Sequence, residues 1–228
     1  THSLIQMKLS LEIAQNLAIR TLVANGTTSA NAVMVAAGLV AAEADGLASH
    51  GLARLPAYAD QAAVGKVKAA ATPILRRTAP AAIMVDAASG FAYPAVAVGL
   101  KAAEEAVRDQ GVVGLGIVNS HHFGAAGYHI EPLAGRGLVA LAFSNAPASI
   151  APWGGTKGLF GTNPIAFACP SGRDHPLVVD LSISKVARGK IMVAAQRGDP
   201  IPEGWALDTD GMPTTDAKAG LAGTMIPM

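Results

Sequence analysis

The residue pattern of this chain changes once, near Ala71-Thr72-Pro73, and that change constrains the fold more than any other feature. Before it, apolar residues recur at helical spacing over residues 10–25 and 28–45, two segments that each open on Ser or Thr and run into Gly. After it, short apolar segments typical of buried strands alternate with helical ones. We predict strands at 83–86, 112–118, 138–143, 164–168 and 177–181, and helices at 94–108 and 182–196.

This order of elements predicts an α/β protein with a helical N-terminal portion. Residues 1–72 form the helical portion, and residues 73–228 form the portion that contains the sheet. No internal repeat or low-complexity linker divides the chain further.

Composition argues against several functions. The chain is 51% hydrophobic and 14% charged with a formal net charge of +1, and Arg76-Arg77 is its basic pair, so we expect no nucleic-acid partner. Apolar runs are too short for a membrane span, and the His and Cys spacings build no closed metal site. The lone Cys169 and the lack of a secretory signal favour a cytoplasmic protein. The low charged fraction suggests burial against another subunit.

The segment from Ser49 to Tyr58 contains polar groups suited to proton transfer and carboxylate binding. His50, Arg54 and Tyr58 are spaced four residues apart, which would align them on one face of a helix. Pro56 makes a turn that enters a helix equally acceptable. Imidazole can protonate a developing anion, and the Arg fork matches a carboxylate. A structural His at a turn and an Arg paired on the surface remain the alternative.

A second polar segment, Asn119 to Tyr128, follows the strand predicted at 112–118. Ligands of α/β proteins favour the carboxyl ends of strands, and small residues after His122 would let a cofactor approach a helix N-terminus. Neither the dinucleotide fingerprint Gly-x-Gly-x-x-Gly nor a P-loop is present, since the glycines at 111–116 and 154–158 have the wrong order. A Rossmann site is therefore not expected.

Several blocks together resemble the type-2 malate/L-lactate dehydrogenase (sulfolactate dehydrogenase-like) oxidoreductase family. They occur in family order over nearly the whole chain: Ser49-His50-Gly51 with Arg54, 119–124, 126–128, Asn145, 152–155, 161–167, 180–184, 189–191, 201–205 and 213–216. The resemblance implies a homodimeric oxidoreductase that uses NADP or NAD, whose cofactor-binding sheet domain is not a Rossmann fold.

The resemblance also assigns roles by position. It implies that His50 is the proton donor and acceptor, with Ser49 as its relay neighbour and Asp180 as a third catalytic member. Arg54 and Thr162 would hold a small carboxylate substrate. The cofactor would be lined by His122, Phe123, Gly124, Ala125, Ala126, Asn145, Val179, Asp180 and Leu181. In some family members the histidine at the position of His122 is the acid–base residue. His122 therefore remains the alternative to His50 for proton transfer.

The segment Ser184-Lys185-Val186-Ala187-Arg188-Gly189 resembles the branch that reduces cyclic α-imino acids, Δ1-piperideine-2-carboxylate and Δ1-pyrroline-2-carboxylate. A 2-hydroxy-acid dehydrogenase of the malate/L-lactate type is the alternative. Family members continue with a further C-terminal segment beyond the position of Met228. A truncated, non-catalytic family member is therefore a third expectation.

Overall fold

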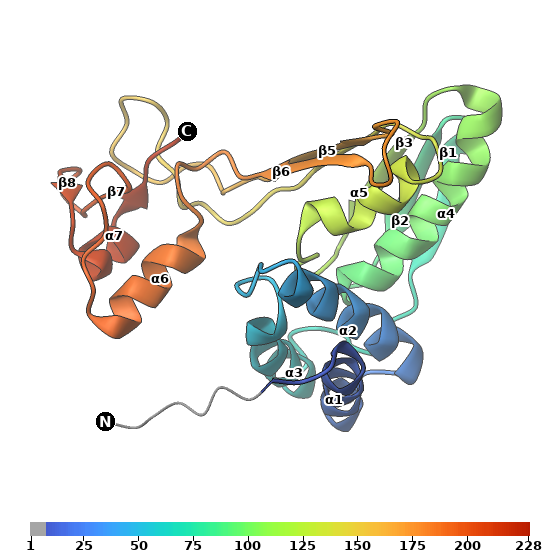
Figure 1. Ribbon diagram of the computed structural model, residues 1–228, viewed down its shortest axis with the longest axis horizontal. Helices are drawn as coiled ribbons and strands as arrows, with labels where there is room; N and C mark the ends of the chain where they lie inside the picture. Colours follow the sequence, from blue (N-terminus) through green and yellow to red (C-terminus); the bar gives the residue numbers. More distant parts are fainter. Residues whose placement is uncertain (1–7) are drawn as a thin grey trace. The chain divides into compact units, whose positions relative to one another are not determined.

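The computed structural model describes residues 8–228, and Figure 1 shows the order of its elements. The chain divides into two units, Thr1–His129 and Ile130–Met228. Helices come first and strands follow from residue 74 on, so the predicted α/β class with a helical N-terminal portion is confirmed. The change of residue pattern near residue 73 marks the passage from helices to strands inside the first unit.

The first unit opens with two capped helices, α1 (Leu11–Ala24) and α2 (Ser29–Ala44). The hydroxyl of Ser10 accepts the backbone N–H of Ile13 at 3.2 Å, and that of Thr28 accepts the N–H of Asn31 at 3.3 Å. These caps satisfy amides that the first helical turn leaves without partners. A 3₁₀ turn, η1 (Leu52–Arg54), then leads into α3 (Leu55–Ala63).

Pro56 stands in the first turn of α3, where its missing N–H costs no hydrogen bond. Of the two conformations left open for this segment, the turn that enters a helix near Pro56 is the one observed.

A three-stranded sheet completes the first unit. Strand β1 (Ile74–Ala79) pairs antiparallel with β2 (Ala82–Asp86), and β2 pairs parallel with β3 (Gly114–Val118). Helix α4 (Ala92–Gln110) makes the crossover between the parallel strands and packs on them through Ala95 and Ala106. The carboxyl ends of β2 and β3 therefore lie side by side, as expected for a parallel pair.

The second unit begins within α5 (Ala126–Ala134), followed by an antiparallel sheet of β4 (Ala140–Phe143), β5 (Ile165–Cys169) and β6 (Leu177–Leu181). The register gives this sheet two unlike faces. One face, which we call the small-residue face, contains Ala140, Ala142 and the fully buried Ala166 and Ala168, together with Val178 and Asp180. The other, which we call the apolar sheet face, consists of Leu141, Phe143, Ile165, Phe167, Cys169, Leu177, Val179 and Leu181.

The rest of the second unit is built around its own core. Helices α6 (Arg188–Arg197) and α7 (Ala217–Ala222) pack with a small sheet of β7 (Ala206–Leu207), β8 (Pro213–Thr214) and β9 (Thr224–Met225). Ile150, Ile191 and Met225 are fully buried at its centre.

Helix α6 begins at Arg188, six residues after the predicted start at Ser182. Over the intervening residues, the hydroxyls of Ser182 and Ser184 lie 2.7 Å apart, and Ser184 Oγ donates to the carbonyl of Val186 at 2.7 Å. Serine hydroxyls that bond locally in this way compete with helix formation.

Among the described residues, no helix is both long and apolar enough to cross a membrane. No group of three or more His, Cys, Asp or Glu side chains in the same part of the chain is arranged to hold a metal ion.

Candidate active site

Ser49 and His50 stand in the turn between α2 and η1. The backbone N–H of His50 donates to the carbonyl of Leu47 at 2.8 Å, and Glu43 on α2 accepts the N–H of Leu52 through Oε2 at 2.9 Å. A side chain at Gly51 would collide with Glu43, so the turn lies directly against the helix. Ser49 Oγ lies 3.1 Å from His50 Nδ1, which links the half-buried ring to an exposed hydroxyl.

Arg54 is held by the same turn. Its Nε donates to the carbonyl oxygen of Ser49 at 2.6 Å. The side chain is half-buried, and its guanidinium charge acts on Tyr58, His121 and His122. Because Nε is the atom engaged, the two terminal amino groups are the ones that a bidentate contact with a carboxylate would use.

Tyr58 on α3 joins this turn to the segment that follows β3. Its side chain is 2% exposed, and its hydroxyl lies 2.6 Å from His122 Nδ1. The backbone N–H of Gly124 also points to His122 Nδ1, at 3.3 Å. The rings of His50 and His122 stack at 5.7 Å between centroids with 24° between their planes. The two imidazoles that the sequence proposed for acid–base work are therefore neighbours.

His121 bonds to a different residue of α3. Its Nε2 lies 2.6 Å from Gln61 Oε1, and its ring packs edge-on against Tyr58 and Phe91. Amide oxygens only accept, so Nε2 carries the proton and the buried Nδ1, which has no hydrogen-bond partner, does not. Gln61 was not among the predicted site residues, although its position one turn after Tyr58 on the same helix face could have indicated it.

Burial governs the titration of this cluster. Burial lowers the pKa of His122 to about 3, with Arg54, His50 and His121 adding repulsion. His122 is exposed as a residue, yet its ring is crowded by protein around Nδ1, and the loss of solvent there disfavours its charged form. Burial likewise lowers the pKa of His121 to about 4. It raises the pKa of Tyr58 to about 12, so Tyr58 remains a neutral phenol.

The loop after β2 supports the segment that carries His121 and His122. Asp86 Oδ1 accepts the N–H of Ala88 at 2.7 Å and the side-chain amide of Asn119 at 3.1 Å, and the Ala88 amide lowers the Asp86 pKa. Ala88, Ser89 and Asn119 all have positive φ, at 52°, 62° and 50°. Non-glycine residues adopt this conformation at a cost of about 1–2 kcal/mol each, which the surrounding hydrogen bonds offset.

Asp86 was also not predicted. Its position could have indicated it, because Asp86 is the last residue of a strand and ligand sites of α/β proteins lie at the carboxyl ends of strands.

The start of α5 completes the first-unit group. Phe123 and His129 stack at 5.4 Å with nearly parallel rings, and His129 Nε2 lies 2.6 Å from the carbonyl oxygen of Phe123. Gly124 has φ +75° and approaches the hydroxyl of Tyr93 so closely that a Cβ would collide with it. No side chain from Gly124 to Gly127 is larger than methyl, and Ala125 is half-buried whereas Gly124, Ala126 and Gly127 are buried.

The remaining predicted residues gather at one end of the second unit's sheet, where β4 ends, β5 begins and β6 ends. Asn145 is exposed just after β4. Asn163 Oδ1 accepts the N–H of Ala146 at 2.9 Å, and the carbonyl of Thr162 accepts the N–H of Ile183 at 2.9 Å.

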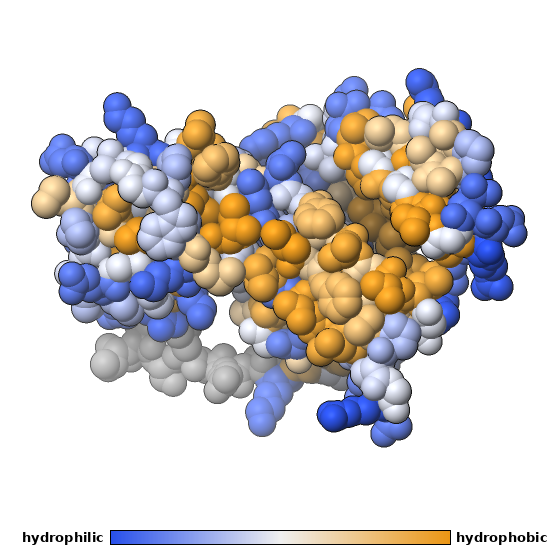
Figure 2. Space-filling view, turned by 90° about the horizontal axis from the view of Figure 1, so that it is seen from above, coloured by the Kyte–Doolittle hydropathy of each residue, from blue (hydrophilic) through white to orange (hydrophobic). Residues whose placement is uncertain are grey.

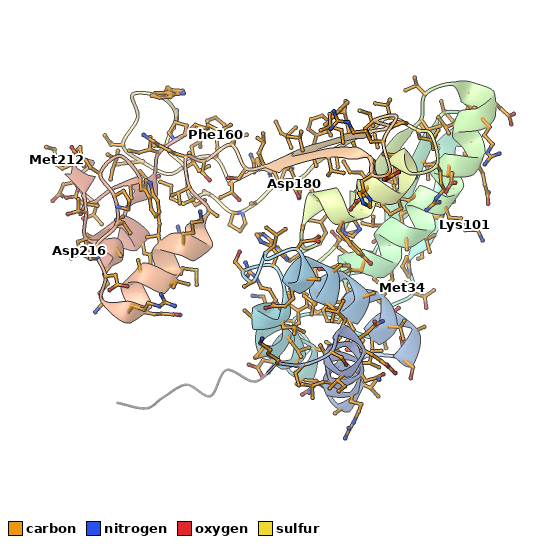
Figure 3. The ribbon with its side chains drawn as sticks, in the orientation of Figure 1. Met34, Lys101, Phe160, Asp180, Met212 and Asp216 are labelled. Carbon is orange, nitrogen blue, oxygen red and sulfur yellow. The ribbon has the colours of Figure 1, made fainter. Side chains whose placement is uncertain are left out.

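Strand β6 places its predicted site residues on both faces of this sheet. Asp180, labelled in Figure 3, pairs with Ala166 and so belongs to the small-residue face, whereas Val179 and Leu181 belong to the apolar sheet face. The side chains of the predicted 179–181 segment therefore alternate between the two faces. A ligand on the small-residue face can contact Asp180, and a ligand on the apolar sheet face can contact Val179 and Leu181.

The structure thus gathers the predicted residues into two groups, one in each unit. The first comprises Ser49, His50, Arg54 and the segment from His122 to Ala126, with Tyr58 between them. The second comprises Asn145, Thr162, Val179, Asp180 and Leu181.

Comparison with known proteins shows which family this chain resembles. The family model of malate/L-lactate dehydrogenases matches residues 9–228. A (2R)-3-sulfolactate dehydrogenase (NADP(+)) of Chromohalobacter salexigens is 54% identical over 219 residues, or 96% of this chain and 66% of that protein. A Delta(1)-pyrroline-2-carboxylate/Delta(1)-piperideine-2-carboxylate reductase of Pseudomonas putida is 43% identical over 199 residues, or 87% of this chain and 58% of that protein.

Among solved structures, delta1-piperideine-2-carboxylate reductase from Pseudomonas syringae is similar with a TM-score of 0.94 at 38% identity, over 98% of this chain and 68% of that one. This chain spans 66% and 58% of the length of the two curated relatives named above. The sequence blocks, the fold and the relatives agree, and the resemblance proposed from the sequence is confirmed. The chain belongs to the malate/L-lactate dehydrogenase family.

Proposed function

We propose that this chain is an NADP(H)-dependent oxidoreductase that reduces the C=N bond of a cyclic α-imino acid, Δ1-piperideine-2-carboxylate or Δ1-pyrroline-2-carboxylate. One observation carries the proposal: His50, linked to an exposed Ser49 hydroxyl, stacks on His122 beside the Arg54 guanidinium. A proton donor, an anion-binding group and a second imidazole next to the small-residue start of α5 together suit reduction of a small carboxylate.

In the proposed reaction Arg54 binds the substrate carboxylate with its terminal amino groups. His50 supplies or takes the proton, with Ser49 passing it to solvent. An imine that arrives protonated needs little help from an acid, because its nitrogen already carries the proton. The carbon of the C=N bond receives the hydride, so the double bond becomes a single bond and the product is a cyclic secondary amine.

The residues present fit a nicotinamide cofactor. A helix N-terminus without bulky side chains suits a phosphate group, and α5 begins in this way at Ala126. His122, Phe123, Gly124, Ala125 and Ala126 of the first unit would line the cofactor. When bound, the nicotinamide supplies the hydride. The NADP(+) named for the 54% identical relative supports NADP over NAD.

A 2-hydroxy acid is the second candidate substrate, because the 54% identical relative is named a sulfolactate dehydrogenase. The imino acids come first because relatives at 38–43% identity are named for them and the chain carries the Ser184–Gly189 segment. The two candidates differ in what they demand of His50. A ketone oxygen must gain a proton during reduction, whereas a protonated imine nitrogen need not.

We further propose a cytoplasmic homodimer. The apolar sheet face supports association with a second copy, since Leu141 is 61% and Phe143 69% exposed and the face carries no charged side chain. Figure 2 shows broad apolar areas on the molecular surface. The lone Cys169 fits a reducing compartment.

The test is NADPH oxidation by the wild type and by His50→Asn and His122→Asn. We expect His50→Asn to lower kcat by about 10²–10⁴ while NADPH binding changes little, and to lower it more with a keto acid than with the imine. A larger loss in His122→Asn than in His50→Asn would contradict the proposed roles. Quenching of protein fluorescence by NADPH separates a chain that binds no cofactor from one that binds but does not react.

A further inference from the structure

The hydrogen bond between Tyr58 and His122 joins two residues 64 positions apart in the chain. At 2.6 Å it is short, and the Tyr58 side chain is almost fully buried. Without His122, the buried phenol would keep only its interaction with the Tyr93 hydroxyl. The pair can form in two ways, because either the phenol donates to Nδ1 or a protonated Nδ1 donates to the phenol oxygen.

The backbone of Gly124 decides between them. Its N–H points to the same Nδ1 at 3.3 Å, and a backbone N–H can only donate. Nδ1 must therefore accept, so it carries no proton and Tyr58 is the donor. In a neutral imidazole the proton then stands on Nε2.

The same contacts oppose a positive charge on the ring. Protonation of Nδ1 would place an N–H against the Gly124 N–H and would force the Tyr58 hydroxyl to turn away inside the protein. The other groups that act on this ring are Arg54, His50 and His121, and none of them supplies a negative charge. Two directed donors and a cationic neighbour thus favour one neutral tautomer.

We propose that Tyr58 is a positioning residue that holds His122 as the neutral Nε2–H tautomer, so that His122 donates a hydrogen bond to the bound ligand and leaves proton transfer to His50. The part concerning the ligand rests on the proposed function, whereas the tautomer stands on the contacts of the first unit. The group that accepts from Nε2 would be a carboxylate oxygen of the substrate or the carboxamide oxygen of the cofactor.

The test is a two-bond ¹H–¹⁵N spectrum of the ¹⁵N-histidine-labelled chain, with the His122 signals assigned by their loss in His122→Gln. In the wild type we expect a protonated Nε2 and a hydrogen-bonded, unprotonated Nδ1, unchanged from pH 8 to pH 5. In Tyr58→Phe we expect a mixture of tautomers and a pKa that moves toward the ordinary histidine value.

Tyr128→Phe is the matched control, since it removes a phenol hydroxyl from the same unit, where the Tyr128 ring packs on Tyr93 and His129. We expect the His122 signals of this variant to match the wild type. A wild-type spectrum with the proton on Nδ1 overturns the proposal even if Tyr58→Phe fails to fold. Unchanged tautomer and titration in a folded Tyr58→Phe overturn it as well.

Steady-state kinetics and NADPH binding complete the test. They also distinguish a failure of the tautomer assignment from a failure of the proposed function. We expect Tyr58→Phe to raise KM or the NADPH Kd about tenfold or more while kcat falls less, because a misaligned donor weakens binding more than proton transfer. A tenfold or larger loss of kcat with unchanged KM and unchanged NADPH Kd would contradict the donor role. If the spectra behave as expected but the chain neither binds NADPH nor turns over any substrate, the proposed function fails and the tautomer assignment stands.

Discussion

Arg54 shows how one turn can prepare a side chain for ligand binding. Its Nε is engaged by the Ser49 carbonyl at 2.6 Å, which orients the planar fork before any substrate arrives. Lysine lacks both the fork and an atom equivalent to Nε, and it presents a point charge. The contact therefore ties the geometry of the Ser49-His50 turn to the geometry of the anion-binding group.

We expect Arg54→Lys to raise KM for the carboxylate substrate by about tenfold or more, because a bidentate charged hydrogen bond is replaced by a single contact. The change in kcat should be smaller. Steady-state kinetics at saturating NADPH measure both. An unchanged KM would remove Arg54 from the binding site.

His121 and His122 predict how stability depends on pH. Burial lowers their pKa values to about 4 and about 3, below the value of about 6.5 for an unfolded chain. As pH falls below about 6.5 the unfolded chain takes up protons that the folded chain does not, so the free energy of unfolding decreases.

We expect the urea midpoint to be highest above pH 6.5 and to fall steadily down to about pH 4. The slope should be shallower in His121→Gln, which removes one of the two groups. A wild-type midpoint that stays constant from pH 7 to pH 4.5 would contradict the buried, neutral state of both rings.

At the level of elements, the sequence predicts well where an element has buried residues or, as in β6, consists almost entirely of apolar residues. Helices α1, α2 and α4 and strands β2 and β6 occur where hydrophobic spacing and caps place them. Strand β1 was missed because all six of its residues are exposed, so no burial pattern marks it. Strands β7 to β9 span two residues each, too few for any period to show.

The site is predictable in its residue types and less so in its contacts. Ser49, His50, Arg54 and the segment from His122 on could be proposed from motifs and chemistry. The bonds of Tyr58 to His122 and of Gln61 to His121 join residues about 60 positions apart, and only the fold brings them together. The support that Asp86 gives to Asn119 depends in the same way on the pairing of β2 with β3.

The packing of α2 on Tyr93 gives a prediction for an element. A Cβ at Gly38 would collide with the Tyr93 ring, which is 3% exposed and lies against Gly124 as well. Alanine favours a helix by about 1 kcal/mol over glycine, whereas overpacking costs about 1–3 kcal/mol.

We therefore expect Gly38→Ala to lower the free energy of unfolding by about 1–2 kcal/mol, measured by urea denaturation. In a Tyr93→Leu background the same change should be neutral or stabilising, because the ring that it meets is gone. Equal effects in both backgrounds would show that Gly38 and Tyr93 do not share this contact.

For the whole molecule, the apolar sheet face predicts the state of association. Glutamate at Leu141 and Phe143 would place two charges where we propose a second copy binds. We expect the wild type to sediment as a dimer and Leu141→Glu/Phe143→Glu to sediment as a monomer. Val64→Lys, at a residue of the first unit that is 78% exposed, is the control and should remain dimeric. A monomeric wild type, or a dimeric double variant, would contradict the proposal.

The central claim concerns the reaction. The most direct measurement is kcat/KM with NADPH and with NADH for Δ1-piperideine-2-carboxylate, pyruvate, oxaloacetate and sulfopyruvate, the keto acid of sulfolactate. A pocket fitted to the ring gains about 1–3 kcal/mol per extra buried methylene, and the imine arrives already protonated. We expect the cyclic imine with NADPH to give the highest value. A higher value for any of the keto acids would place the chain among the 2-hydroxy-acid dehydrogenases, and no turnover of any of them would contradict the account.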